Sequence, residues 1–304
     1  MAILLLFLSI FSIYGCQTSQ DISSSSSTTT SSSTSPTTST TVPAAGDVFS
    51  VFFIDVGQGD SILIKTNSGH YVLIDSGPSD ASNGVNAFLN AKGVTSIYRM
   101  ILTHPHADHY GEFKDVIGNY TIGGFMFTNY PNANSTCVSL MTKLATYSIP
   151  TIEVKDGDSF TLDNLTFRFY HPPNTGFIST SSDENDNSLA IKVSNPSGVD
   201  LLDCGDLETA GLSSLLSKHN SDLEIELLKV DHHGSSSGTN QTFLTATTPT
   251  DAFICVGVTN PYGHPDAVTL NLLSTNGIDT YRTDLNGNIT VSVSGSSYSI
   301  MTQK

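Results

Sequence analysis

The sequence predicts an α/β fold of the α+β type in four layers, with two sheets packed face to face and helices on their outer surfaces. The first half of the folded region reads as successive strands, then a helix, then another strand. The second half repeats this succession of element types without a close repeat of residues. Two such halves favour an αββα sandwich, because each sheet can bury one face against the other and its second face against helices.

Apolar runs bounded by glycine-rich turns are expected to form the strands of the first half. They lie at 48–56, 61–66, 70–78 and 98–102, and a helix is expected at 82–92. In the second half, strands are expected at 165–171, 188–194, 199–206, 224–233, 251–257 and 288–294. Helices are expected there at 207–219 and 265–276.

The N-terminal segment differs in composition from the rest of the chain. Residues 1–16 form a short apolar run that ends in Gly15 and Cys16, which is typical of an export signal. The run resembles the lipobox of bacterial lipoproteins, in which the cysteine is acylated, although no Lys or Arg precedes it. A cleaved secretory signal is the alternative. Residues 17–46 are mostly Ser and Thr and are expected to be a disordered linker, followed by a folded domain at 47–304.

The charge and the cysteines limit the function classes. The 304 residues carry a formal net charge of −16, which repels polyanions at long range and argues against tight binding of long DNA. It does not exclude local cleavage in which bound cations contact the phosphates. After Cys16 only Cys137, Cys204 and Cys255 remain, and this odd number gives no disulfide framework. Cys204 and Cys255 lie in apolar strands and are expected to be buried thiols.

The segment ILTHPHADHYGE concentrates side chains that can bind metal. It contains His104, His106, Asp108 and His109, after an apolar strand and before a segment that reads as a helix. Residues two apart on an extended segment point the same way, so His104 and His106 can converge on one ion. Asp108 and His109 lie where the chain turns into the helix and can bind a second ion. The spacing therefore predicts two divalent ions, for which mixed N and O ligands suit zinc or manganese.

Two ions at such a site share a water and usually a carboxylate. Asp206 is the expected bridge, because it ends an apolar strand and Gly205 beside it lets the backbone turn. The last ligand is expected from the pair His232 and His233 at the end of another strand. The residues alone do not say which of the pair binds.

Seven motifs occur in a fixed order along the chain: IDVGQGDSILI, LIDSG, THPHADHYGE, DNSLAIKV, LDCGDLE, LLKVDHHGSSSG and NPYGHP. The HxHxDH pattern is the metal signature of the metallo-β-lactamase superfamily, and the set as a whole resembles the hydrolase-like domain of ComEC-type competence proteins. The resemblance implies the four-layer metallo-β-lactamase sandwich. One departure is large: no apolar stretch of about 18 or more residues is present, unlike the membrane channel of those proteins. DNA transport by this polypeptide is therefore not implied.

The resemblance also implies roles for individual residues. The implied metal ligands are His104, His106, Asp108, His109, Asp206 and His232. The implied catalytic residues are Asp108, which would also orient the nucleophile, His233, which would face the substrate, and His264, which would contact the phosphate or the leaving group.

Three further residues are expected near the site. Asp75 is expected to accept a hydrogen bond from a ligand histidine, or else to cap its turn. Asp60 is expected either to line the site or to hold its glycine-rich turn. His171 occupies roughly the place of an extra histidine in other superfamily members, and a plain loop histidine is the alternative.

The leading expectation for function is a metal-dependent phosphodiesterase that works outside the cytoplasm or at the cell surface, with single-stranded DNA as one candidate substrate. A second class is hydrolysis of a non-nucleic substrate, such as a cell-wall or phospholipid phosphoester, a lactone or a β-lactam. A third is a surface binding protein with a degenerate site, which the complete ligand set disfavours. A lipidated Cys16 would attach the protein to a membrane, and no protein partner is expected.

Overall fold

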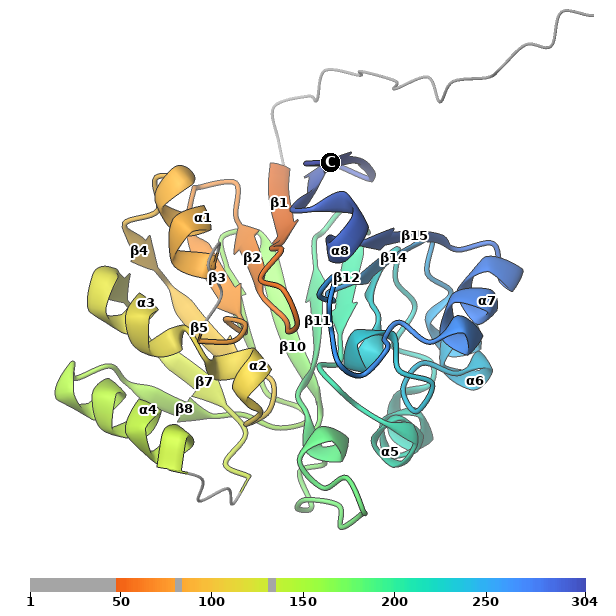
Figure 1. Cartoon of the computed structure of the whole chain (residues 1–304), viewed down its shortest axis with the longest axis horizontal. Helices are drawn as coiled ribbons and strands as arrows, with labels where there is room; N and C mark the ends of the chain where they lie inside the picture. Colours follow the sequence, from red (N-terminus) through yellow and green to blue (C-terminus); the bar gives the residue numbers. More distant parts are fainter. Residues whose placement is uncertain (1–47, 80–83, 131–134) are drawn as a thin grey trace, which may run out of the picture. The chain divides into compact units, whose positions relative to one another are not determined.

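A computed structural model describes residues 48–79, 84–130 and 135–304. Within these ranges the chain forms two large sheets and a two-stranded pair, with helices on the outer faces of the large sheets (Figure 1). The prediction of a four-layer αββα sandwich is confirmed. The expected signal at 1–16, with Cys16, and the expected linker at 17–46 lie outside the described residues.

The first sheet combines strands from the N-terminal half with the last two strands of the chain. Its members are β1 (Val48–Phe53), β2 (Ile62–Lys65), β3 (Tyr71–Ile74), β5 (Arg99–Leu102), β7 (Phe125–Phe127), β8 (Thr151–Glu153), β16 (Ile289–Ser294) and β17 (Ser297–Thr302). They are hydrogen-bonded in the order β17-β16-β1-β2-β3-β5-β7-β8. The pairs from β3 to β8 are parallel, so the carboxyl ends of these strands lie at one edge of the sheet.

The second sheet is built from the C-terminal half. Its members are β9 (Ser159–Leu162), β10 (Leu165–His171), β11 (Ala190–Ser194), β12 (Asp200–Asp203), β13 (Leu227–Lys229), β14 (Asp251–Ile254) and β15 (Asp279–Arg282). Their order is β15-β14-β13-β12-β11-β10-β9, and the four strands from β12 to β15 are parallel. The small pair consists of β4 (Ser96–Ile97) and β6 (Thr121–Ile122).

Helices cover both outer faces. The helices are α1 (Val85–Ala91), α2 (Ala107–Tyr110), α3 (Phe113–Asn119), α4 (Ser135–Thr146), α5 (Thr209–His219), α6 (Gln241–Thr247), α7 (Ala267–Thr275) and α8 (Thr283–Asn286). Two short 3-10 turns, η1 (Asn185–Asn187) and η2 (Asp231–Gly234), lie close to the site described below. Local sequence fixes the start of α6, where the Asn240 side chain accepts a hydrogen bond from the Phe243 backbone N–H at 3.0 Å.

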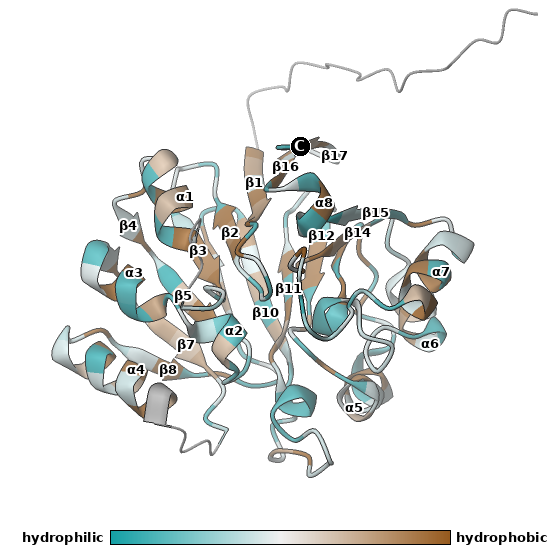
Figure 2. Cartoon of the chain, viewed as in Figure 1, coloured by the Kyte–Doolittle hydropathy of each residue, from teal (hydrophilic) through white to brown (hydrophobic). Residues whose placement is uncertain are grey.

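The alternation of side chains along each strand produces the layers. On β1, Val51 and Phe53 belong to the apolar core between the sheets, whereas Phe52 packs into the core beneath α1 and α3. This is the period of two expected for a strand buried on both faces. Phe53 of the first sheet stacks on Phe253 of the second, with ring centroids 4.2 Å apart. The strands are accordingly largely apolar in Figure 2, and the helices mix apolar and polar residues.

The strand and helix predictions are confirmed in type, but several bounds shift inward. The helix expected at 207–219 is α5 at Thr209–His219, and the strand expected at 224–233 is only β13 at Leu227–Lys229. Cys204 and Cys255 are buried and unbridged, as expected. Across the described ranges, no helix combines the length and the hydropathy needed to cross a bilayer.

Candidate metal centre and active site

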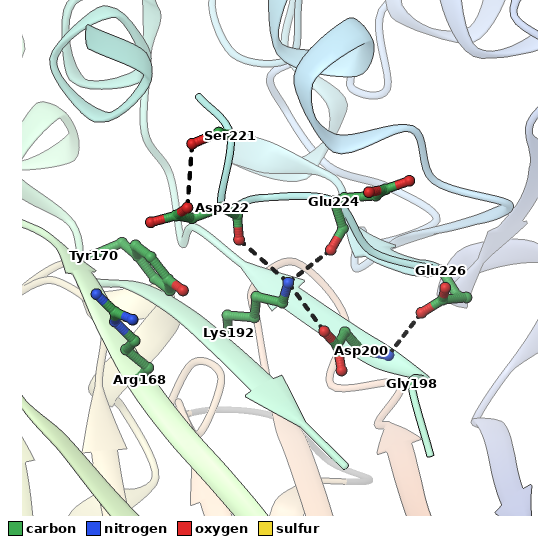
Figure 3. A pocket seen from close by; sticks show the side chains of 9 residues that line it. All are labelled: Arg168, Tyr170, Lys192, Gly198, Asp200, Ser221, Asp222, Glu224 and Glu226. Atoms are coloured by element: carbon green, nitrogen blue, oxygen red, sulfur yellow. Dashed lines mark hydrogen bonds and ion pairs between the residues drawn. The ribbon is translucent and has the colours of Figure 1, made fainter. Parts of the chain in front are cut away.

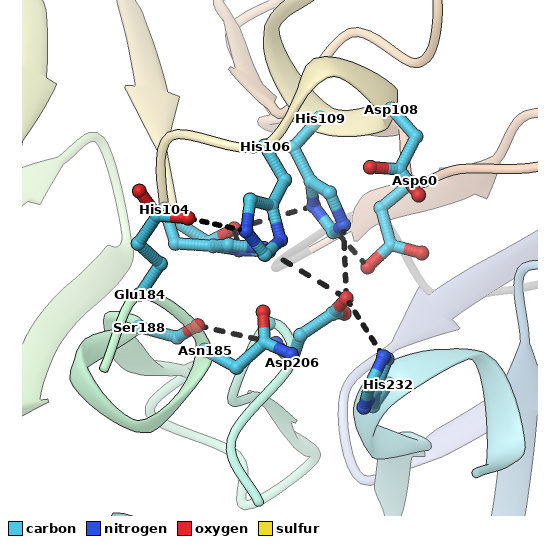
Figure 4. Close-up of polar contacts among 12 residues, drawn as sticks. Asp60, His104, His106, Asp108, His109, Glu184, Asn185, Ser188, Asp206 and His232 are labelled. Atoms are coloured by element: carbon cyan, nitrogen blue, oxygen red, sulfur yellow. Dashed lines mark hydrogen bonds and ion pairs between the residues drawn. The ribbon is translucent and has the colours of Figure 1, made fainter. Parts of the chain in front are cut away.

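The expected site residues meet at the carboxyl edge of both sheets. Asp75 follows β3, and the HxHxDH segment follows β5 and runs into α2. On the other sheet, Asp206 follows β12, and His232 and His233 follow β13. In parallel sheets, residues just beyond the carboxyl ends of the strands are well placed to meet a ligand. Residues far apart in the sequence therefore converge because the two sheets present the same edge (Figure 4).

Asp206 lies at the centre of this cluster and is buried. Its Oδ2 atom is 3.8 Å from His104 Nε2, 3.3 Å from His109 Nε2 and 3.4 Å from His233 Nε2. Two donors that each bind one zinc ion at about 2.1 Å can be at most about 4.2 Å apart, so all three distances suit shared ions. The Asp206 carboxylate thus lies between His104, which is expected at the first ion, and His109 and His233, which are placed for the second ion.

Asp108 forms one group of candidate ligands with His109 and His233. Its Oδ2 atom lies 3.3 Å from His233 Nε2, and donor atoms of Asp108, His109 and His233 lie within 4.8 Å of one another. A second such group consists of His104, His109 and Asp206. These overlapping groups, which share His109, are candidate metal ligands.

The ring nitrogens that point away from the cluster are held by acceptors. His109 Nδ1 contacts Asp75 Oδ2 at 2.7 Å, and His233 Nδ1 contacts the Cys255 carbonyl at 2.9 Å. Asp75 is itself fixed by Thr103, whose backbone N–H donates to Asp75 Oδ1 at 2.9 Å. Such contacts select the tautomer whose other nitrogen is free to bind metal. Asp75 therefore makes the contact expected of it.

Close packing of the turn at Gly59 against the backbone of Asp108 fixes the position of the HxHxDH segment. Gly59 has a φ of +136°, and a Cβ atom placed there would lie 2.2 Å from the Asp108 carbonyl oxygen. The neighbouring Asp60 backbone N–H donates to that same oxygen at 3.2 Å. Only glycine permits this approach, which explains why the turn GQGDS accompanies the metal motif.

The two histidines of the pair share an unusual backbone conformation but differ in burial. His232 and His233 have φ values of 48° and 53°, in the left-handed backbone region that residues other than glycine rarely adopt. His233 is buried in the cluster, whereas His232 Nε2 is 3.9 Å from Asp206 Oδ2 and its side chain is 22% exposed. Donor atoms of His233, and not those of His232, belong to the candidate metal groups.

The electrostatics of the cluster favour bound cations. Burial would raise the pKa of Asp206, but the His233 and His109 rings beside it hold that pKa well below its ordinary value. Burial and the neighbouring His109 lower the pKa of His104, which keeps its imidazole neutral and able to bind metal.

Three buried polar atoms of the cluster have no hydrogen-bond partner among the described residues: His109 Nε2, His233 Nε2 and Asp206 Oδ1. Buried polar atoms without partners are rare, and each such atom needs an explanation. A divalent ion between these atoms provides one, since neutral imidazole nitrogens and a carboxylate are its preferred ligands. The residues present therefore fit a metal centre.

The structure adds two residues that the sequence analysis missed. Lys229 is fully buried at the end of β13, forms an ion pair with Asp60 and donates to the Gly205 carbonyl at 2.9 Å. A single lysine inside the apolar run LLKV was the available signal. Glu184, just before η1, contacts His106 Nε2 through Oε2 at 2.7 Å, and nothing in its local sequence indicates this contact.

Three other expected residues lie outside the candidate metal groups: His106, His264 and His171. His106 was expected as a ligand of the first ion, and its Nδ1 atom lies 3.0 Å from His104 Nε2. His264 contacts Asp266 Oδ1 through Nδ1 at 3.2 Å, and its ring centroid is 5.6 Å from that of His232. It therefore lies at the side of the cluster next to His232. His171 is buried with its Nδ1 atom 3.0 Å from the Ser188 carbonyl, and burial lowers its pKa to about 4. The structure does not bring His171 into the described metal groups.

The open side of the cluster is polar and acidic. A cleft of about 440 Å³ beside His106 is lined by Tyr130 and by residues 180–185, which include Asp183 and Glu184. Among the described residues, Lys229 is the one lysine or arginine that makes an ion pair within the cluster, and it is buried beneath it. A second cleft, of about 530 Å³ on β10 and β11, has its own Lys192–Asp200 ion pair and includes none of the site residues (Figure 3).

Comparison with known proteins agrees with this geometry. A sequence profile described as "Metallo-beta-lactamase superfamily" matches residues 54–192. The chain is 31% identical over 240 residues to competence protein ComA of Neisseria gonorrhoeae, covering 77% of this chain and 30% of that protein. It is 27% identical over 264 residues to ComE operon protein 3 of Bacillus subtilis (strain 168), covering 81% of this chain and 33% of that protein. The chain thus spans about a third of the length of these relatives.

A solved structure shows the same fold. CmlA, a diiron β-hydroxylase from Streptomyces venezuelae, matches with a TM-score of 0.57 at 14% identity, covering 82% of this chain and 54% of that chain. At this identity the likeness concerns the fold. The profile match, the similar relatives, the αββα sandwich and the ligand-rich strand ends together lead to one conclusion: the chain belongs to the metallo-β-lactamase superfamily, as a metallohydrolase that resembles the hydrolase-like domain of ComEC-type competence proteins.

Proposed function

We propose that the protein is a two-metal phosphodiesterase that acts on small or short phosphodiesters. The observation that carries this proposal is the position of Asp206 Oδ2, within 3.8 Å of the Nε2 atoms of His104, His109 and His233. One carboxylate shared by two histidine groups is the arrangement that a pair of ions needs. The similarity to competence proteins is compatible with a phosphoester or DNA substrate.

The proposed ligands follow from the geometry. His104, His106 and Asp206 would hold the first ion, and Asp108, His109 and His233 would hold the second, with Asp206 shared. His233 replaces His232 in this set, because its buried Nε2 atom lies 3.4 Å from Asp206 Oδ2 and 3.3 Å from Asp108 Oδ2, and its donor atoms belong to the candidate metal groups. Zinc and manganese both suit this donor set.

Bound divalent ions supply an activated water and neutralise the charge that develops on the phosphoryl oxygens. The protein side chains orient the reactants around them. Asp108, whose side chain is 30% exposed, is placed to orient the attacking water and to accept its proton. His232, with its neighbour His264, is placed to hold a proton for the leaving oxygen.

The acidic surroundings favour a small substrate over a long polyanion. Among the described residues, the cleft beside His106 has Asp183 and Glu184 in its lining and no lysine or arginine. Long nucleic acids are bound through many phosphate contacts to such cations. A small diester instead requires only the contacts that the metal centre itself provides.

We also propose that the enzyme works outside the cytoplasm, held at a membrane through an acylated Cys16. The apolar run at 1–16 and the Ser/Thr-rich segment at 17–46 support this location.

The salt dependence of the reaction tests the substrate class. We expect kcat/KM for bis(p-nitrophenyl) phosphate to change little with NaCl, whereas kcat/KM for single-stranded DNA should be lower and rise at least about twofold as the Debye length shortens from about 30 Å to about 10 Å. The reason is that the chain and the polyanion repel each other, with a net charge of −16 on the chain.

The assay would include a lactone and a β-lactam in parallel, and the Asp206→Asn variant as a control for contaminating nucleases. Faster turnover of the lactone or the β-lactam than of any diester would overturn the phosphodiesterase proposal. DNA cleavage that weakens as salt rises would instead indicate a cationic binding surface for nucleic acid, contrary to the acidic cleft.

A further inference from the structure

Glu184 belongs to neither of the expected ligand groups, yet it contacts the HxHxDH segment directly. Its Oε2 atom lies 2.7 Å from His106 Nε2. On the other side of the same ring, His106 Nδ1 lies 3.0 Å from His104 Nε2. Figure 4 shows Glu184 reaching His106 from the segment before η1, which belongs to the second half of the chain. The His106 ring is therefore held between His104 on one side and the Glu184 carboxylate on the other.

The orientation of His106 is the reverse of that of the other three histidines. His104, His109 and His233 each have Nδ1 against an acceptor, at 3.2 Å from Thr103 Oγ1, 2.7 Å from Asp75 Oδ2 and 2.9 Å from the Cys255 carbonyl, respectively. Their Nε2 atoms therefore face the centre of the cluster. His106 has Nε2 against an acceptor, and its Nδ1 faces His104. A histidine that binds metal through Nδ1 needs an acceptor at Nε2 to fix that tautomer.

The segment that carries Glu184 is held in place independently of His106. Asn187 Nδ2 donates to the carbonyls of Ile178 and Asp183 at 2.8 and 2.7 Å. Asp186 Oδ1 accepts from the Gly211 backbone N–H at 2.8 Å, which ties the turn to α5. The carboxylate is thus presented to His106 by a supported turn.

We propose that Glu184 is a positioning residue of the first metal site, which fixes His106 as the tautomer with Nε2–H and turns Nδ1 toward the ion. This inference rests on the proposed two-metal function. It also makes the first site depend on both halves of the chain, since His106 and Glu184 are 78 residues apart.

The contact contributes to orientation more than to folding stability. The side chains of His106 and Glu184 are 37% and 36% exposed, and exposed ion pairs add little to stability. The melting temperature of the metal-free protein should therefore stay unchanged when Glu184 is replaced. A change confined to metal binding would separate a positioning role from a structural one.

The test is a metal titration of the full chain in competition with a chromophoric chelator, using zinc and, for its visible absorption, cobalt(II). Glu184→Ala should weaken the binding of one of the two ions by about 10–100-fold and leave the other near its wild-type affinity. Glu184→Gln should regain most of this loss, because the amide oxygen can still accept from His106 Nε2–H.

Glu224→Gln provides a control with the same loss of charge. Glu224 lies in the cleft of Figure 3, away from the metal cluster, and its contact with Lys192 is made by its backbone carbonyl. We expect this variant to bind both ions as the wild type does. A similar loss of metal affinity in Glu224→Gln and Glu184→Ala would mean that the loss of one negative charge explains the effect, and it would overturn the positioning role.

Two other outcomes would also contradict the inference. Wild-type affinity in Glu184→Ala would exclude a positioning role. A Glu184→Gln variant as weak as Glu184→Ala, with an altered cobalt(II) spectrum, would mean that Glu184 is itself a ligand. In both cases the wild-type titration still shows two ions, so the proposed function survives; a wild-type protein that binds no metal would overturn both.

Discussion

Asp206→Asn is expected to abolish hydrolysis and to lower the metal content of the protein. The substitution keeps the shape of the side chain but removes the negative charge that lies 3.3 Å from His109 Nε2 and 3.4 Å from His233 Nε2. The paired ions contribute several kcal/mol to the transition state, so their disruption should cost at least about a thousandfold in kcat. The measurements are turnover of bis(p-nitrophenyl) phosphate and elemental analysis of the same sample.

Asp203→Asn is the matched control. Asp203 is buried at the end of the same strand, but its Oδ1 atom accepts from the Gly205 backbone N–H at 2.9 Å, and it belongs to none of the candidate metal groups. Burial raises the pKa of Asp203 to about 7, so the neutral amide resembles a form that it readily adopts. We expect this variant to retain its metal and most of its activity. An Asp206→Asn protein with wild-type turnover and full metal content would refute the shared-ligand role.

Lys229→Met is expected to produce the largest loss of stability. Lys229 is fully buried and forms an ion pair with the equally buried Asp60. Burial would lower the pKa of Lys229, but Asp60 and the nearby Asp206 hold it well above its ordinary value, so the ammonium is charged. Removing one partner of a buried pair leaves the other charge uncompensated and costs about 3–5 kcal/mol. For a domain of this size, the melting temperature should fall by on the order of 10 °C.

Two further variants complete this experiment. Lys218→Met removes a lysine whose side chain is 53% exposed and pairs with Asp156. Asp156 is buried but keeps its contact with His219 Nε2 at 2.9 Å, so the melting temperature should change little. The double variant Lys229→Met, Asp60→Leu removes both buried charges and should recover part of the lost stability. A single Lys229→Met variant that melts with the wild type would show that the buried pair contributes nothing net.

The local part of the site could be predicted from the sequence. The apolar strand and the HxHxDH spacing predicted that His104 and Asp108 would lie at a strand–helix junction. The structure places His104 just after β5, which ends at Leu102, and Asp108 in α2. The order of strands and helices, together with the resemblance, also predicted two packed sheets. The strand expected at 288–294 was grouped with the second half, but as β16 it pairs with β1 in the first sheet. Short elements such as β7 (Phe125–Phe127) were missed, because three residues carry too little pattern to distinguish a strand from a loop.

The remaining features depend on long-range geometry. The sequence could not choose between His232 and His233, because adjacent histidines have the same local pattern and only the folded structure shows that His233 is buried beside Asp206, whereas the His232 side chain is 22% exposed. Glu184 was missed for a related reason: its contact with His106 depends on how a loop of one half approaches the strand ends of the other. Asp206 was predictable because it lies just beyond the end of an apolar strand, β12, and the site residues of both sheets lie beyond strand ends.

The metal content of the wild-type chain tests the central claim most directly. Protein stripped of metal, reconstituted with saturating zinc or manganese and freed of excess ion would be measured by elemental analysis. The cluster around Asp206 predicts about two ions per chain, since Asp206 Oδ2 lies within 3.8 Å of His104 Nε2 on one side and of His109 Nε2 and His233 Nε2 on the other. A stoichiometry clearly below about one ion per chain with either metal would contradict a two-metal centre.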